Sequence, residues 1–141
     1  MTTDHGSATA SPGAAGRSEM DGEHHIQLSL LYALREAVDA SRDDDVHDIL
    51  ERLIDYSKMH FASEQLLMRL YQYGDYERHA LDHEQMMQQF DDLRSRQDGG
   101  GALVAGALDD IERGLADHIR WADAALGEYL ANLSQHPQRT G

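Results

Sequence analysis

The sequence predicts an all-α protein folded as an antiparallel, up-down-up-down four-helix bundle, and three observations support this. Apolar residues recur at spacings of three and four in four segments, which is the periodicity of helices that bury one face. No stretch alternates polar and apolar residues for long enough to form a strand. The two prolines, at positions 12 and 137, lie outside all four segments, and the connections between segments are short, as this topology requires.

The first two helices are expected at about residues 21–41 and 43–73. Asp21 is a candidate N-cap of the first helix, because its carboxylate can accept a hydrogen bond from a free amide at the helix start. The three aspartates after Arg42 suit the first turn of the second helix, where the helix dipole favours negative charge. Gly74 is expected to end the second helix. The buried stripe of that helix is expected to comprise Val46, Leu50, Leu53, Ser57, His60, Glu64, Leu67 and Tyr71.

The third helix is expected to follow Asp75 as its N-cap and to end at the glycine run 99–101. The fourth is expected to begin near Ala102. The interior stripes of these helices are expected to contain Tyr76, His79, His83, Met86 or Met87, Phe90 and Leu93, and Leu115, His118, Ile119, Ala122, Leu126 and Leu130. One bundle domain, residues 20–133, is therefore expected between a flexible N-terminal tail, 1–19, and a C-terminal tail, 134–141.

The composition narrows the classes of function. Acidic residues outnumber basic ones 26 to 12 in a chain of 141 residues, and the formal charge of −14 argues against nucleic acid and anionic membranes as partners. No apolar run approaches the ~20 residues that cross a bilayer, and the N-terminus has no pattern of a secretory signal, so we expect a cytoplasmic protein. The chain has no cysteine, which excludes disulfides and thiolate metal sites. Any metal must be held by nitrogen and oxygen.

Two pairs of metal-ligating side chains stand on the predicted interior stripes. Residues four apart on a helix project side by side, offset by only ~40°. His60 and Glu64 form one such pair in the second helix. His79 and His83 form another in the third. Imidazoles and a carboxylate are costly to bury without partners, so these pairs indicate a common ligand.

The first and fourth helices add candidates to this set. His24 is preferred to its neighbour His25, because His24 places leucines rather than polar residues on the inward face. His118 lies on the interior stripe of the fourth helix. Asp123 follows five residues later, ~140° away on an ideal helix, so spacing alone does not put the two on one face. Asp123 nevertheless lies among apolar residues where an unpaired aspartate would be out of place.

Five imidazoles and two carboxylates are too many donors for one ion. The set suits iron, copper, zinc or nickel rather than calcium or magnesium. Two ions bridged by the carboxylates fit the count. With one further bridging oxygen, the ion that has three histidines is six-coordinate, whereas the ion that has two is five-coordinate. Its open position could bind a small neutral ligand such as dioxygen.

The motifs resemble the hemerythrin and bacteriohemerythrin family, over residues 20–133. They are D-x-x-H at 21–24, H-x-x-x-E at 60–64, H-x-x-x-H at 79–83 and H-x-x-x-x-D at 118–123. The resemblance implies reversible binding of dioxygen, as peroxide, at the five-coordinate iron of a pair bridged by oxo or hydroxo. It implies that one iron is held by His79, His83 and His118 and the other by His24 and His60, with Glu64 and Asp123 as bridges. It also implies an apolar ligand pocket of Phe61, Leu115 and Ile119.

One departure from the family pattern concerns that pocket. Gly114 stands where the family often has a tryptophan, four residues before the fourth-helix histidine, and Trp121 stands one turn after it. A missing ring would widen the pocket or its entrance and speed autoxidation.

Two other classes of function remain as alternatives to an oxygen carrier or sensor. The same site could serve a di-iron enzyme acting on peroxide or nitric oxide, or an iron store or metal-stabilised structural bundle. We expect a monomer, because no large exposed apolar stripe is read from the sequence. His5, His47 and His136 are expected to be solvated.

Overall fold

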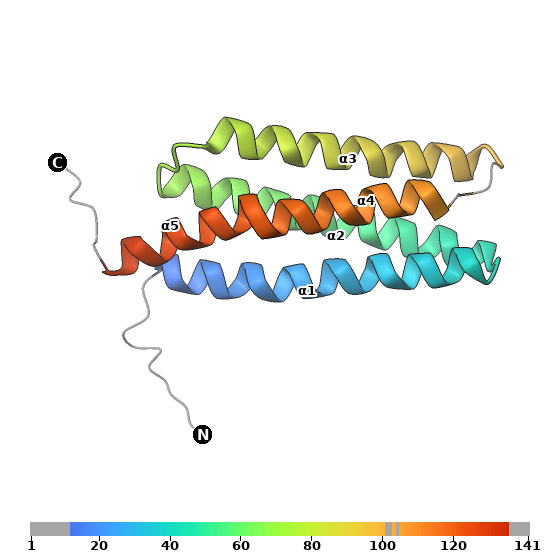
Figure 1. Ribbon diagram of the computed structural model, residues 1–141, viewed down its shortest axis with the longest axis horizontal. Helices are drawn as coiled ribbons and strands as arrows, with labels where there is room; N and C mark the ends of the chain where they lie inside the picture. The colour runs from blue at the N-terminus through green and yellow to red at the C-terminus, as the bar shows by residue number, and fades with distance from the viewer. Residues whose placement is uncertain (1–11, 101–102, 104, 136–141) are drawn as a thin grey trace, which may run out of the picture.

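The computed structural model describes residues 12–100, 103 and 105–135, and it confirms the all-α four-helix bundle (Figure 1). Its elements are α1 (Pro12–Asp39), α2 (Asp43–Leu70), α3 (Tyr76–Asp98), α4 (Ala105–Asp117), the π-helix η2 (His118–Asp123) and α5 (Ala124–Gln135). The last three follow one another without a break and form the fourth rod of the bundle (Figure 1). Within the described ranges, no helix has the length and hydrophobicity needed to cross a membrane.

Short connections make neighbouring helices antiparallel. The start of α1, the connection from α2 to α3 and the end of α5 lie at one end of the bundle (Figure 1). The connections from α1 to α2 and from α3 to α4 lie at the other end. α1 packs against α2 and α5, and α3 packs against α2 and α4. A residue near the middle of each helix can therefore face the same interior region.

The start of α1 differs from the expectation. The helix begins at Pro12, and Asp21 lies inside it rather than at its N-cap. Proline is well accommodated in a first helical turn, because the amide hydrogen that it lacks would have no partner there. The alanines and the Glu19–Met20 pair that follow are good helix formers. Residues 12–19, which were assigned to the tail, are thus helical, and residues 1–11 and 136–141 lie outside the described part.

The end of α2 also differs from the expectation, because no glycine makes it. α2 ends at Leu70 rather than at Gly74, and Gln72 takes a left-handed conformation with φ of 55°. The amide of Gln72 bonds to the carbonyl of Arg69 and the amide of Tyr73 to that of Met68, at 3.3 and 2.9 Å. This is a Schellman motif. Ser41, with φ of 56°, closes α1 in the same way.

The other helix boundaries are close to those expected. The aspartates after Arg42 occupy the first turn of α2. Asp75 precedes α3, although its side chain makes no capping hydrogen bond. α3 ends before Gly99 and Gly100, the latter with φ of 84°. The fourth rod starts at Ala105, three residues after the expected position near Ala102.

The core consists of two apolar clusters separated by a polar layer. The large apolar cluster comprises Leu31, Leu34, Ala37, Val46, Leu50, Leu53, Ile54, Phe61, Met86, Phe90, Leu93, Leu108, Ile111 and Leu115. The small apolar cluster has Met68, Leu126 and Leu130 at its centre. The buried polar layer between them consists of His24, His60, Glu64, His79, His83, His118 and Asp123, and the buried polar side chains of Gln27 and Ser57 lie beside it, next to the large apolar cluster. The layer is enclosed by apolar packing on both sides, so its groups must satisfy one another or a ligand.

The surface is less uniformly polar than expected. Met59, Leu66 and Leu70 are exposed at spacings that place them on one outward face of α2. Trp121 is 69% exposed. A monomeric state therefore stays a prediction.

Candidate metal centre

The structure brings together all seven side chains that the sequence predicts as ligands. α1 supplies one, α2 and α3 supply two each, and η2 supplies two. All seven are buried: His24, His60, Glu64, His79, His83, His118 and Asp123. His25, the alternative on the first helix, is exposed, and so is His47. His5 and His136 lie outside the described residues.

The π-helix explains how His118 and Asp123 share one face. In a π-helix the backbone bonds run from residue i to residue i+5, so residues five apart lie on the same side of the helix. η2 begins at His118 and ends at Asp123, and both side chains are buried. On an α-helix the same spacing would have turned Asp123 away by ~140°. The local change of helix type therefore completes the cluster.

The two oxygens of Glu64 face different histidines. Oε1 lies 3.1 Å from Nε2 of His79 and 2.8 Å from Nε2 of His83. Oε2 lies 3.1 Å from Nε2 of His60 and 3.4 Å from Nε2 of His24. The carboxylate thus stands between a pair of imidazoles from α3 and a pair from α1 and α2.

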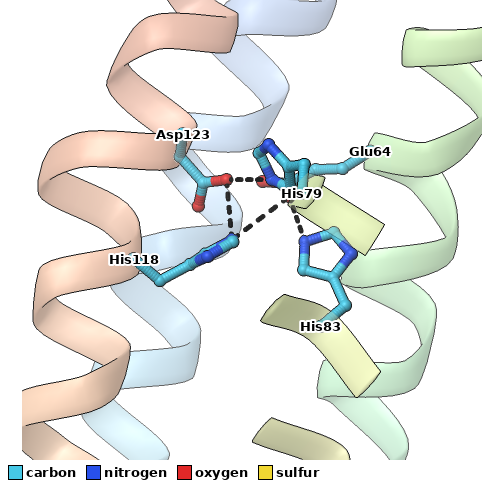
Figure 2. A group of neighbouring side chains, drawn as sticks. All are labelled: Glu64, His79, His83, His118 and Asp123. Atoms are coloured by element: carbon cyan, nitrogen blue, oxygen red, sulfur yellow. Dashed lines mark hydrogen bonds and ion pairs between the residues drawn. The ribbon is translucent and has the colours of Figure 1, made fainter. Parts of the chain in front are cut away.

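Asp123 divides its oxygens in the same way. Oδ1 lies 2.9 Å from Nε2 of His79 and 3.1 Å from Nε2 of His118. Oδ2 lies 2.7 Å from Nε2 of His24. Figure 2 shows His79 and His83 from α3 and His118 from η2 directed toward the two carboxylates.

The ligand atoms form two groups that share both carboxylates. Within each group the atoms lie within 4.8 Å of one another. One group consists of Glu64, His79, His83, His118 and Asp123, and the other of His24, His60, Glu64 and Asp123. This is the arrangement that two bridged cations need.

Several atoms of the cluster have no hydrogen-bond partner among the described residues, although they are buried. They are Nε2 of His60, both ring nitrogens of His118 and both carboxylate oxygens of Asp123. Nε2 of His60 lies 3.1 Å from Oε2 of Glu64, and Nε2 of His118 lies 3.1 Å from Oδ1 of Asp123, but the orientation of these groups is not that of a hydrogen bond. Buried polar atoms without partners cost folding free energy. Imidazole and carboxylate lone pairs that converge in this way fit divalent transition metals.

In the metal-free chain, protons balance the carboxylate charges. Burial disfavours the charged form of His118, but Asp123 and Glu64 outweigh it and raise its pKa to about 10. The same balance raises the pKa of His24 to about 9. Burial would raise the pKa of Glu64, yet the surrounding imidazoles, His118 first, hold that pKa well below its usual range. Binding of cations would therefore release protons from the imidazoles.

Oxygen atoms outside the cluster face Nδ1 of three histidines. Nδ1 of His60 donates to Glu23 at 2.6 Å, Nδ1 of His83 donates to Gln65 at 3.0 Å, and Nδ1 of His118 lies 3.4 Å from Asp82. A proton held at Nδ1 leaves Nε2 free as the metal ligand. Sequence reasoning missed these residues, although each stands next in the sequence to a predicted ligand.

The three predicted pocket residues lie beside the cluster. The ring of Phe61 stacks on that of His83, with centroids 4.1 Å apart and planes 11° from parallel. Leu115 is fully buried in the large apolar cluster, and Ile119 packs against it. Their role as a ligand pocket stays a prediction.

A cavity of about 560 Å³ lies between α3 and the fourth rod, lined by Gly114, His118 and Trp121 among others. A Cβ atom at Gly114 would meet only Oε1 of Gln89, at 4.0 Å. The space that a larger side chain would fill at position 114 is therefore open and leads toward His118.

The chain is similar in sequence to known proteins. The family described as Hemerythrin HHE cation binding domain matches residues 15–130. The bacteriohemerythrin of Methylococcus capsulatus (Bath) is 27% identical over 112 residues, which are 79% of this chain and 86% of that protein. The bacteriohemerythrin of Stenotrophomonas maltophilia is 26% identical over 121 residues, 85% of this chain and 79% of that protein. No solved structure matches the chain significantly. Taken with the buried cluster of histidines and carboxylates, the match over most of the chain shows that it belongs to the hemerythrin family of cation-binding domains.

Proposed function

We propose that this chain binds dioxygen reversibly at a pair of non-haem iron ions. One observation carries the proposal: each carboxylate directs one oxygen to the His79 side of the cluster and the other to the His24 side. The proposed ligands of one iron are His79, His83 and His118, those of the other are His24 and His60, and Glu64 and Asp123 bridge them.

The donor set suits iron among other transition metals and divides unequally between two ions. Three imidazoles would hold one iron, whereas only His24 and His60 would hold the other, so the second iron would keep a position open for a small ligand. When bound, the two irons would supply the electrons that reduce dioxygen reversibly.

The residues of the chain control what reaches the open position. The large apolar cluster, which includes Phe61, excludes water from one side of the polar layer, and the small apolar cluster closes the other. Glu23 holds the His60 ring through Nδ1, which fixes the direction of its Nε2 lone pair. The relatives named bacteriohemerythrin support a binding protein over an enzyme.

A second candidate function is a di-iron enzyme that acts on peroxide or nitric oxide. The cavity beside Gly114 favours it, because that cavity gives solvent a route toward His118. Open access suits turnover, whereas a carrier benefits from a closed pocket.

One experiment separates the two functions. Iron-loaded protein is reduced without oxygen and exposed to air while its near-ultraviolet and visible spectrum is recorded. Reversible binding predicts a charge-transfer band that appears in air and disappears under vacuum. Immediate, permanent oxidation together with consumption of added peroxide would support the enzyme instead. Protein that retains zinc but no iron would contradict both.

A further inference from the structure

A buried polar pair lies beside the cluster and has no part in the proposed ligand set. Nε2 of Gln27 donates a hydrogen bond to Oγ of Ser57 at 2.8 Å, and both side chains are fully buried. Oε1 of Gln27 is buried without a hydrogen-bond partner among the described residues. Half of this carboxamide is thus unsatisfied inside the protein.

Helix geometry places the pair next to the two-histidine end of the cluster. Gln27 follows His24 by three residues on α1, and Ser57 precedes His60 by three on α2. Residues three apart on one helix are neighbours, with Cβ atoms about 5–6 Å apart. Because α1 and α2 are antiparallel, both steps lead toward the large apolar cluster. The pair therefore forms part of the next layer.

The remainder of that layer is apolar. Met86 and Leu115 stand three residues from His83 and His118, on the same side, and both belong to the large apolar cluster. An amide in these surroundings is destabilising when one of its polar atoms has no partner. A contact that only joins α1 to α2 could be made by a side chain without a second polar atom such as Oε1.

The pair can present either end of the amide to a ligand. A serine hydroxyl both donates and accepts, so it can hold Oε1 as well as Nε2. The oxygen and nitrogen of a glutamine side chain exchange places by a half-turn. The free end is then a donor for an anion or an acceptor for a protonated ligand.

We propose that Gln27, anchored by Ser57, is a binding residue that hydrogen-bonds the outer atom of a small anionic or protonated ligand held at the His24–His60 end. This inference rests on the proposed function, since it assumes iron at that end. It makes the pocket selective for ligands that form hydrogen bonds.

Azide is the probe, because it is a linear anion whose outer nitrogen accepts hydrogen bonds. Its dissociation constant is measured on oxidised, iron-loaded protein from the azide-to-iron charge-transfer band. Gln27→Leu should weaken azide binding roughly two- to tenfold, the range expected for one hydrogen bond. Ser57→Ala should weaken it less, because the amide stays but loses its anchor.

Gln97→Leu is the matched control. Gln97 also has a buried Oε1 without a partner among the described residues, but it lies near the end of α3, far along the helix from His83. This variant should bind azide like the parent. Equal affinity in Gln27→Leu and the parent, or equal weakening in both leucine variants, would overturn the proposal.

Thermal unfolding of the iron-free protein provides a readout that does not depend on the metal. The double variant Gln27→Leu/Ser57→Ala should unfold at the same or a higher temperature than the parent, because it removes the unsatisfied amide together with its buried hydrogen-bond partner. Lower stability with unchanged azide affinity would make the pair a packing contact and contradict the inference. A parent that binds no iron would instead refute the proposed function.

Discussion

At the scale of single residues, the centre depends on which of two adjacent histidines faces inward. His24 lies 2.7 Å from Asp123, whereas His25 is exposed on the same helix. His24→Ala should lower the iron-to-protein ratio, because it removes one of the two imidazoles at that end. His25→Ala is the matched control and should leave the ratio unchanged. Metal analysis of both purified variants checks this, and a loss of iron in His25→Ala alone would contradict it.

Protonation of the imidazoles also belongs to this scale. The pKa of His24 is raised from 6.5 to about 9 and that of His118 to about 10, in each case because the two carboxylates outweigh burial. A raised pKa stabilises the fold below the unfolded-state value and ceases to do so as pH rises through the folded-state value. The iron-free protein should therefore lose stability as pH rises from 6.5 through about 10.

Thermal unfolding at a series of pH values checks this prediction. Cobalt-loaded protein is the control, since Nε2 then carries a metal ion in place of a proton. Its unfolding temperature should change less across the same range. Unfolding temperatures that fall equally with pH in the iron-free and the cobalt-loaded protein would contradict this prediction.

At the scale of elements, the ends of the helices show where local sequence signals fail. Gln72 closes α2 in a left-handed conformation, which residues other than glycine adopt at a cost of order 1 kcal/mol. Gln72→Gly should stabilise the protein by up to about 1 kcal/mol, because glycine takes this conformation without strain. Gly74→Ala is a useful comparison, since no left-handed φ is found at Gly74. Denaturant unfolding of both variants measures the effect, and a destabilised Gln72→Gly would be the contrary result.

The contact between α3 and the fourth rod determines access to the cluster. Gly114 leaves a cavity of about 560 Å³ that is also lined by His118. Gly114→Trp should fill part of it and slow autoxidation of the reduced, iron-loaded protein, because less water and fewer anions reach the centre. The rate is followed spectroscopically in air, with Gly106→Trp as a control at an exposed position of α4. Autoxidation that is equally fast in Gly114→Trp and the parent would show that water and anions reach the centre by a route other than this cavity.

Much of the site follows from helical periodicity, and the rest depends on local backbone changes. The pairs at 60 and 64 and at 79 and 83 are four residues apart on regular α-helices, so their common direction was predictable. Spacing did not predict that Asp123 shares a face with His118, because the π-helix that turns it inward has no clear sequence signal. Gln27 was missed because a lone glutamine on an apolar stripe carries no motif. The left-handed Gln72 was missed for a similar reason, since nearby Gly74 is the commoner helix stop.

At the scale of the whole molecule, the bundle holds a polar layer between two apolar clusters. The large apolar cluster contains residues of all four rods, so its packing holds them together. The polar layer then holds the seven candidate ligand side chains in two groups that share both carboxylates. The fold would thus set the geometry of the site, and bound metal ions would balance its charge.

We propose that two iron ions share Glu64 and Asp123. X-ray absorption spectroscopy at the iron edge, on protein with a measured iron content, tests whether they do. We expect two irons per chain, nitrogen and oxygen ligands only, and an iron–iron distance of at most roughly 4 Å, as in other two-metal sites. One iron per chain, or two without scattering from a neighbouring iron, would contradict it.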